Sequence, residues 1–221
     1  MTMLTHPEAP PEITATTRPE PAVALKRRTI DSVLIAFGAV LTAALLVAGA
    51  LLTWGANFAD DYVGDELSSQ NISFPPTEAL IEEGRDDLAQ YGGEAVDTGK
   101  EAEAYASFID GHLANIADGQ TYADLGAPES AAKAAVTAAK EDGASEAQIA
   151  ELQGEADAVS GQRNSLFKGE TLRGLLLTAF AWSTVGTIAG YAALGAFIAA
   201  AAMFVLVLLG LRHHHKVVVQ S

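Results

Sequence analysis

Histidine is the side chain here best suited to metal or acid–base chemistry, since the chain has five histidines and no cysteine. Without cysteine there are no disulfides, no thiolate catalysis and no Cys-based metal sites. His112 stands alone in the central region, one helical turn after Phe108, and residues 213–215 form a histidine run near the C-terminus. A metal site needs three or four converging ligands. The sequence therefore predicts a packed or partly buried His112, no catalytic or metal-ligating residue, and no cofactor.

Acidic residues cluster in four pairs along the central region, at 60–61, 65–66, 82–83 and 86–87. None has the alternating spacing of a calcium-binding loop, so we predict that they are solvated. The chain also lacks a nucleotide-binding glycine loop and a recognisable Ser-His-Asp arrangement. Its net charge of −15 is opposite to the clustered basic charge that binds a phosphate backbone, so nucleic acid is not an expected partner.

Two hydrophobic blocks frame this acidic region, and the first predicts a transmembrane helix over residues 30–54. It contains 23 residues without charge from Ser32 to Trp54. At 1.5 Å per residue these make about 35 Å of helix, enough to cross a hydrocarbon core of roughly 30 Å. Trp54 stands where an interfacial aromatic anchor belongs. A cleaved signal peptide is the alternative, but its apolar stretch is normally shorter.

The second block, residues 172–211, is too long for one bilayer. Its 38 uncharged residues from Gly174 to Leu211 correspond to about 57 Å of helix. Either two short spans or one long helix fits this length. The block has no proline or polar turn, which favours one helix with a projecting first half and a transmembrane second half. The projecting half supplies an expected interaction surface made of Leu175, Leu176, Phe180 and Trp182.

Small residues recur at four-residue spacing in the second block and predict close helix packing. They are Gly186, Gly190, Ala192, Ala196 and Ala200. The partner helix would be the first span, a second copy of the chain in a homo-oligomer, or another membrane protein. The lipid bilayer is the remaining expected partner.

Basic residues at the ends of the blocks predict the orientation. Lys26, Arg27 and Arg28 precede the first block, and Arg212 and Lys216 follow the second. The loop between them holds 24 Asp and Glu against 6 Lys and Arg. Because basic flanks stay cytoplasmic, we expect a multi-pass plasma-membrane protein with a disordered cytoplasmic tail at 1–29, an acidic helical extracytoplasmic domain at 55–171 and a cytoplasmic tail at 212–221.

Helical periodicity predicts an all-α fold, a two-span transmembrane hairpin with the acidic domain between the spans. One helix is expected over 78–91 with Thr77 as its N-cap, and a second presents one apolar face from Tyr105 to Ile116. An Ala-rich helix is expected from Pro128 to Lys140. Another begins at Ser145, which is its expected N-cap with Gln148 three residues on, and a new helix starts after Gly161.

Two runs resemble a known group of proteins, LRGLLLTAFAWSTVGTIAG at 172–190 and GQTYADL at 119–125. They are similar to small actinobacterial membrane proteins with two spans and no established function, which often carry the label "aromatic ring-opening dioxygenase". The resemblance implies a two-span membrane protein and, through that label, a metal-dependent ring-opening enzyme. The group's motifs assign no catalytic residue, so none is carried over.

The residues favour a non-enzymatic accessory or scaffold protein of the cell envelope. A ring-opening iron enzyme needs two histidines and a carboxylate around one metal, and the predicted topology leaves His112 alone outside. A metal-dependent enzyme is nevertheless the first alternative. The second is a membrane sensor whose external domain reports to the short cytoplasmic tails.

Overall fold

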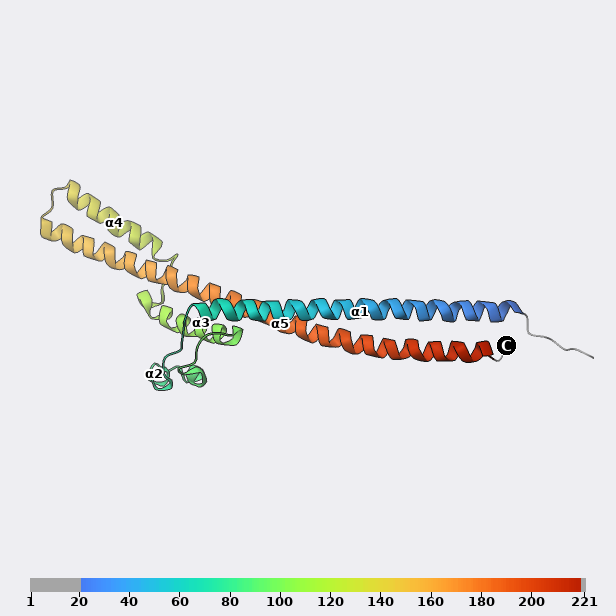
Figure 1. Cartoon of the computed structure of the whole chain (residues 1–221). Coiled ribbons are helices and arrows are strands. Elements are labelled where there is room, and N and C mark those ends of the chain that lie inside the picture. Colours follow the sequence, from blue (N-terminus) through green and yellow to red (C-terminus); the bar gives the residue numbers. More distant parts are fainter. Residues whose placement is uncertain (1–20, 220–221) are drawn as a thin grey trace, which may run out of the picture. The chain divides into compact units, whose positions relative to one another are not determined.

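The computed structural model describes the backbone of residues 21–219 and the side chains of residues 28–213. In this part the chain is all-helical, as predicted, with two long helices and shorter ones between them in sequence (Figure 1). The elements are α1 (Pro21–Ser69), α2 (Thr77–Glu82), the 3-10 helix η1 (Asp86–Tyr91), α3 (Gly99–Ala114), the 3-10 helix η2 (Ile116–Gly119), α4 (Gly126–Glu141) and α5 (Glu146–Val219). The predicted tail at 1–29 lies largely outside the described residues, and α1 begins at Pro21 rather than Ile30.

The chain packs as two compact units, and both long helices contribute to each. The first unit combines the chain up to Val47 with the chain from Ala196, and the second is Ala48–Gly195. By length and composition, α1 and α5 are each able to cross a membrane. We call residues 70–145, which join the two helices within the second unit, the connecting domain.

In the first unit α1 and α5 run antiparallel and approach closely at glycines. A Cβ atom added at Gly38 would lie 2.8 Å from Cγ2 of Val207, and one added at Gly210 would lie 3.0 Å from Cγ1 of Ile35. Thr42 is buried, and its hydroxyl donates to the Gly38 carbonyl at 2.8 Å. Because this hydrogen bond forms within α1 itself, the polar Thr42 side chain can be buried without needing a partner on another helix.

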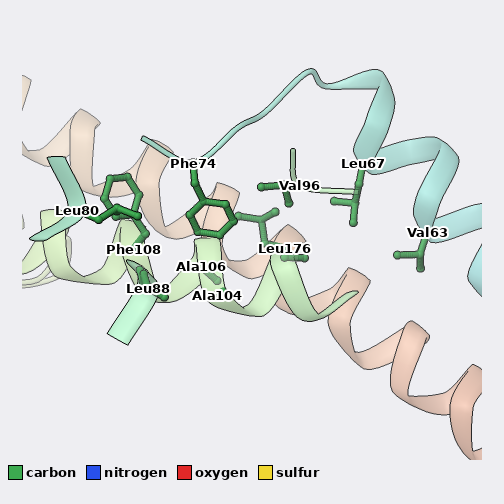
Figure 2. Close-up of a cluster of buried hydrophobic side chains, with 11 residues drawn as sticks. Val63, Leu67, Phe74, Leu80, Leu88, Val96, Ala104, Ala106, Phe108 and Leu176 are labelled. Carbon is green, nitrogen blue, oxygen red and sulfur yellow. The ribbon is translucent and has the colours of Figure 1, made fainter. Parts of the chain in front are cut away.

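The second unit contains the main hydrophobic core, which joins the connecting domain to both long helices (Figure 2). Its buried members are Val63, Leu67, Phe74, Leu80, Leu88, Val96, Ala102, Ala104, Ala106, Phe108 and Leu176. Phe74 stacks on Tyr91 with ring centroids 5.2 Å apart and meets Tyr105 edge-on at the same separation. Leu80 is fully buried. Removing such a side chain from water stabilises the fold by about 1.5–3 kcal/mol.

α4 and the first turns of α5 form an antiparallel hairpin, which we call the arm (Figure 1). The turn uses Gly143 at φ +71°, a conformation that favours glycine. Ser145 and Gln148 cap α5 reciprocally, because each backbone N–H donates to the other's side-chain oxygen, at 3.2 and 3.3 Å. The predicted Ala-rich helix and the Ser145 cap are therefore confirmed. Val136 of α4 and Ala156 of α5 are buried hydrophobic residues of this arm.

Three local predictions are wrong. The helix expected over 78–91 is interrupted, because Gly84 takes a φ of +74° between α2 and η1. Thr77 is not the N-cap, since Pro76 holds that position and the Thr77 hydroxyl donates to the Ala89 carbonyl at 3.3 Å. Gly161 does not start a new helix, because α5 continues through it. The same continuity makes residues 172–211 part of one helix rather than two short spans.

Candidate functional site

The four residues predicted as an interaction surface divide between two faces of α5. Leu176 is 2% exposed within the main core, and Phe180 is half-buried, with its Cα 3.4 Å from a Cβ placed on Gly99 of α3. Leu175 and Trp182 point outward with 64% and 56% of their surface exposed. The inward pair therefore holds the connecting domain on α5, and only the outward pair is free to meet another surface.

The predicted packing glycines lie against α1 within the second unit. A Cβ at Gly186 would lie 3.0 Å from the Ala59 Cβ and 3.3 Å from the Ala56 carbonyl oxygen. A Cβ at Gly190 would lie 3.8 Å from the Ala56 Cβ, which is ordinary contact. Small residues on both helices thus permit this approach.

The alanines that continue this predicted stripe are placed differently. Ala192 is exposed, and its neighbour Ala193 is buried instead, at 3% exposed. In the first unit Ala196 is half-buried and Ala200 is 1% exposed. Ala192 follows Gly190 by only two residues, which is more than half of a 3.6-residue helical turn, so it faces away from the packed side. Ala193, three residues after Gly190, returns to that side.

Three aromatic side chains form an exposed ladder along α1 in the second unit. Trp54 stacks on Phe58 with centroids 5.7 Å apart, and Phe58 stacks on Tyr62 at 6.0 Å. Their exposed fractions are 68%, 57% and 55%. Sequence reasoning singled out Trp54 alone, although four-residue spacing places all three on one helix face.

His112 is exposed over about half of its side chain. Its ring meets Phe108 edge-on at 4.5 Å, and Nδ1 lies 3.1 Å from the Phe108 carbonyl oxygen. Nε2 lies 3.6 Å from a carboxylate oxygen of Glu83. Among residues 28–213, no three His, Asp or Glu side chains are grouped as metal ligands would be.

A strained turn follows α3 and spans residues 117–124, which are two residues before the GQTYADL segment and most of that segment. Ala117, Asp118 and Gly119 have φ values of +53°, +55° and +78°. Non-glycine residues in this region cost on the order of 1 kcal/mol or more each, so the surroundings must hold them. Thr121 and Asp124 bond reciprocally, since the Thr121 hydroxyl donates to the carboxylate at 2.7 Å and accepts from the Asp124 N–H at 3.2 Å.

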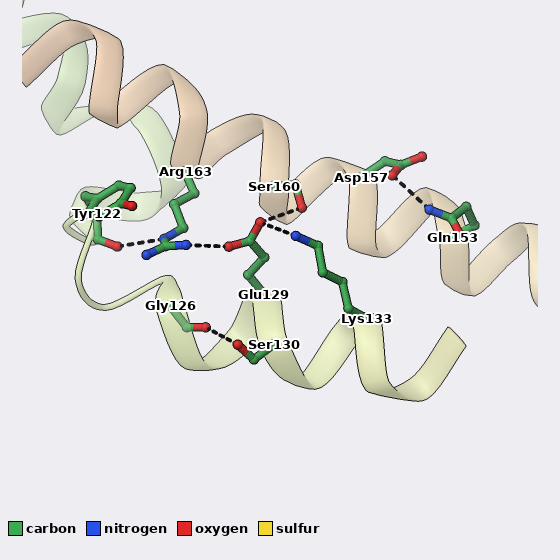
Figure 3. A network of polar contacts seen from close by, with 9 residues as sticks. All are labelled: Tyr122, Gly126, Glu129, Ser130, Lys133, Gln153, Asp157, Ser160 and Arg163. Carbon is green, nitrogen blue, oxygen red and sulfur yellow. Dashed lines mark hydrogen bonds and ion pairs between the residues drawn. The ribbon is translucent and has the colours of Figure 1, made fainter. Parts of the chain in front are cut away.

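Arg163 of α5 clamps this turn to the arm (Figure 3). Its guanidinium donates to the Tyr122 carbonyl at 3.2 Å, lies 4.0 Å from the Tyr122 ring centroid and pairs with Glu129 at 2.6 Å. Lys133, Ser160 and Arg163 all donate to Glu129. Hydrogen bonds from Lys133, then Ser160 and Arg163, lower the pKa of Glu129 to about 2. The clamp therefore holds an ionised carboxylate.

Tyr122 lines two hollows. The larger, about 410 Å³, is lined in part by Asp110, Leu113, Thr121 and Glu170. The carboxylates of Asp110 and Glu170 both pair with Arg173, at 3.3 and 3.2 Å. The smaller, about 220 Å³, opens onto the Arg163 clamp. Arg173 thus pairs with both acids of the larger hollow, and Arg163 pairs with Glu129 at the smaller one.

No protein-family model, curated protein or solved structure matches the chain.

Sequence reasoning missed the Arg163 clamp altogether. Part of a signal was present, because Glu129 and Lys133 stand at the i, i+4 spacing of a helical ion pair. The partner on α5 is far away in sequence, and only the folded arm brings Arg163 to Glu129.

Proposed function

We propose that the chain is a two-span integral membrane protein of the cell envelope, whose acidic connecting domain is held on the extracytoplasmic side. The observation that carries this proposal is the exposed apolar surface of α1 and α5. Phe37, Leu51, Ile188 and Ile198 are each exposed over 62–65% of their surface. Exposed apolar area on this scale is unusual for a protein in water and typical of contact with lipid.

The packing of α5 in the second unit supports a division of this helix near Gly186. Gly186 lies against Ala59, the last uncharged residue of α1 before Asp60. The helices run antiparallel, so residues of α5 before Gly186 lie beside the charged end of α1. This part of α5 also carries Leu176 of the main core. Residues 146–185 therefore suit water, and those that follow suit lipid.

The proposed role is that of a non-enzymatic accessory or scaffold protein. The structural support is the continuity of α5, which carries the arm, the core contact and the apolar segment without a break. A single helix of this kind presents the connecting domain at a fixed place on a membrane anchor.

The topology is tested by single-cysteine labelling, which is clean because the chain has no cysteine. Ala135→Cys lies on the exposed face of α4, and Gln220→Cys lies in the C-terminal tail. A membrane-impermeant maleimide should label Ala135→Cys in intact cells and Gln220→Cys only after permeabilisation. Labelling of Gln220→Cys in intact cells, or protection of Ala135→Cys, would overturn the topology.

The role is tested by crosslinking in intact membranes followed by mass spectrometry. A scaffold should yield one recurring partner across preparations, and the absence of any recurring partner contradicts the role. Metal analysis of purified protein gives an independent check. One iron per chain that is lost in His112→Ala would replace the scaffold proposal with the enzymatic alternative.

A further inference from the structure

The aromatic ladder lies where the chemistry of α1 changes. From Ser32 to Ala59 the helix carries no charge, and Asp60 and Asp61 follow. Trp54 and Phe58 stand on the uncharged side of this change and Tyr62 on the acidic side. Four residues of helix rise about 6 Å, so the ladder covers roughly 12 Å along the axis. That distance reaches from the edge of the hydrocarbon core into the headgroup region.

α5 places two further exposed aromatics at the same level of the second unit. Because Gly186 lies against Ala59 and the helices are antiparallel, Trp182 falls near the level of Tyr62, and Tyr191 falls near that of Trp54. They are 56% and 74% exposed. Tryptophan and tyrosine concentrate at membrane interfaces because their rings are apolar and their N–H or O–H groups need water or headgroup partners.

The connecting domain begins directly beyond this level. A Cβ on Gly64 would lie 3.6 Å from the Asp97 carbonyl oxygen, and Gly99 is in close contact with Ser183. Both contacts lie within a turn or so of Tyr62 and Trp182. The folded domain therefore starts where the aromatics end, with no free stalk between them.

We infer that Trp54, Phe58 and Tyr62, together with Trp182 and Tyr191, form a girdle that binds the headgroup interface of a phospholipid bilayer and seats the connecting domain on the membrane surface. This inference rests on the proposed function, since it requires α1 and α5 to cross the bilayer. Its ligand is the interface itself, with lipid carbonyls and headgroups meeting the polar edges of the rings.

Two tryptophans at two depths make the inference measurable. Trp182→Phe leaves Trp54 as the only tryptophan, and Trp54→Phe leaves Trp182. Each full-length variant is reconstituted in phosphatidylcholine vesicles whose acyl chains are brominated either near the headgroup or near the chain end. Shallow bromines should quench both tryptophans about twofold more than deep ones, and aqueous acrylamide should quench Trp182 more than Trp54.

Two results distinguish failure of the girdle from failure of the proposed function. If the protein stays in the vesicles after alkaline carbonate extraction but deep bromines quench Trp54 most, the girdle is wrong and the two-span proposal stands. If carbonate releases the protein and neither bromine position quenches, both are wrong.

A substitution of the ladder tests its anchoring role directly. Replacing Trp54, Phe58 and Tyr62 by Leu keeps α1 apolar but removes the preference for the interface, and Trp182 remains as the reporter. The ratio of shallow to deep quenching of Trp182 should then fall. Phe37→Leu, combined with Trp54→Phe, is the matched control, because Phe37 is similarly exposed but lies early in the uncharged stretch, far from the change to acidic residues at Asp60. An unchanged ratio in the ladder variant would overturn the inference.

Discussion

Glu129 ties the arm to the GQTYADL turn, and its ionisation makes that tie dependent on pH. Its pKa is about 2, below its ordinary value of 4.5, because Lys133, Ser160 and Arg163 donate hydrogen bonds to the carboxylate. A folded-state pKa below the unfolded value means that the contribution to stability is complete above pH 4.5. It is lost as pH falls toward 2.

Glu129→Gln should therefore lower the unfolding temperature at neutral pH, and the gap from the wild type should close as pH falls from 4.5 to 2. Thermal unfolding followed by circular dichroism across this range measures the gap. Asp87 and Asp124 also have lowered pKa values, but they contribute equally to both proteins. Glu155→Gln, on the exposed face of α5, is the control and should follow the wild type. A gap that stays constant with pH would contradict the prediction.

Some residue-level contacts were within reach of the sequence, and others were not. The Ser145–Gln148 cap was predicted from three-residue spacing, and Thr98–Glu101 shows the same spacing. The Glu101 carboxylate accepts from the Thr98 N–H at 2.9 Å, and the Thr98 hydroxyl accepts from the Glu101 N–H at 3.4 Å. Local spacing determines such caps. Arg163 reaches Tyr122 and Glu129 only through the folded hairpin, which no local pattern specifies.

At the scale of elements, the attachment of α5 to the connecting domain depends on which face of α5 turns inward. Leu176 and Leu175 are adjacent, but one is 2% and the other 64% exposed. Leu176→Glu buries a charge in the main core and should destabilise the second unit by several kcal/mol. Leu175→Glu should have little effect.

Limited proteolysis of the reconstituted protein distinguishes the two variants. We expect new cleavage within the connecting domain for Leu176→Glu and a wild-type pattern for Leu175→Glu. Equal patterns for both variants would mean that α5 does not complete the core.

The contact between α1 and α5 in the second unit should be sensitive to single methyl groups. Gly186→Ala places a Cβ 3.0 Å from the Ala59 Cβ, so the helices must separate slightly, at a cost of about 1–3 kcal/mol. Gly190→Ala makes only ordinary contact at 3.8 Å, and a Cβ at Gly174 meets no atom within 4 Å. Gly174→Ala should stabilise by up to about 1 kcal/mol through helix propensity.

Unfolding midpoints of the three variants, measured in lipid nanodiscs, should fall in the order Gly174→Ala above Gly190→Ala above Gly186→Ala. A Gly186→Ala midpoint at or above that of Gly190→Ala would rule out tight packing at this glycine.

Periodicity predicted the apolar face of α3, since Tyr105, Ile109 and Leu113 all pack into the two hydrophobic clusters. It did not predict where α3 docks. That docking uses Gly99 and Gly169, whose missing side chains admit Ser183 and Leu113. A glycine within a helical pattern signals a close approach only once its partner is known. The two long apolar helices, by contrast, could be predicted from composition alone. A run of residues without charge is recognised in the sequence without knowing what the helix packs against.

At the scale of the whole molecule, α5 passes through three environments as one helix. Its first turns belong to the arm, where few large side chains are buried, and its middle carries Leu176 in the main core. From about Gly186 onward most of its large side chains are exposed and apolar. Amide exchange reports the free energy of local opening and the access of water, so a single helix should show three rates.

Hydrogen exchange of the full chain in nanodiscs, followed by mass spectrometry, measures these rates. Amides in 146–160 should exchange first, those in 166–185 later, and those in 188–208 slowest, by roughly a hundredfold or more relative to the arm. The same chain in detergent is the control, since it retains the apolar environment without a defined bilayer thickness. A uniform rate along α5 would contradict both the membrane boundary near Gly186 and the marginal packing of the arm. Slow exchange confined to 166–185 would instead indicate that only the core protects this helix, and that residues beyond Gly186 do not lie in lipid.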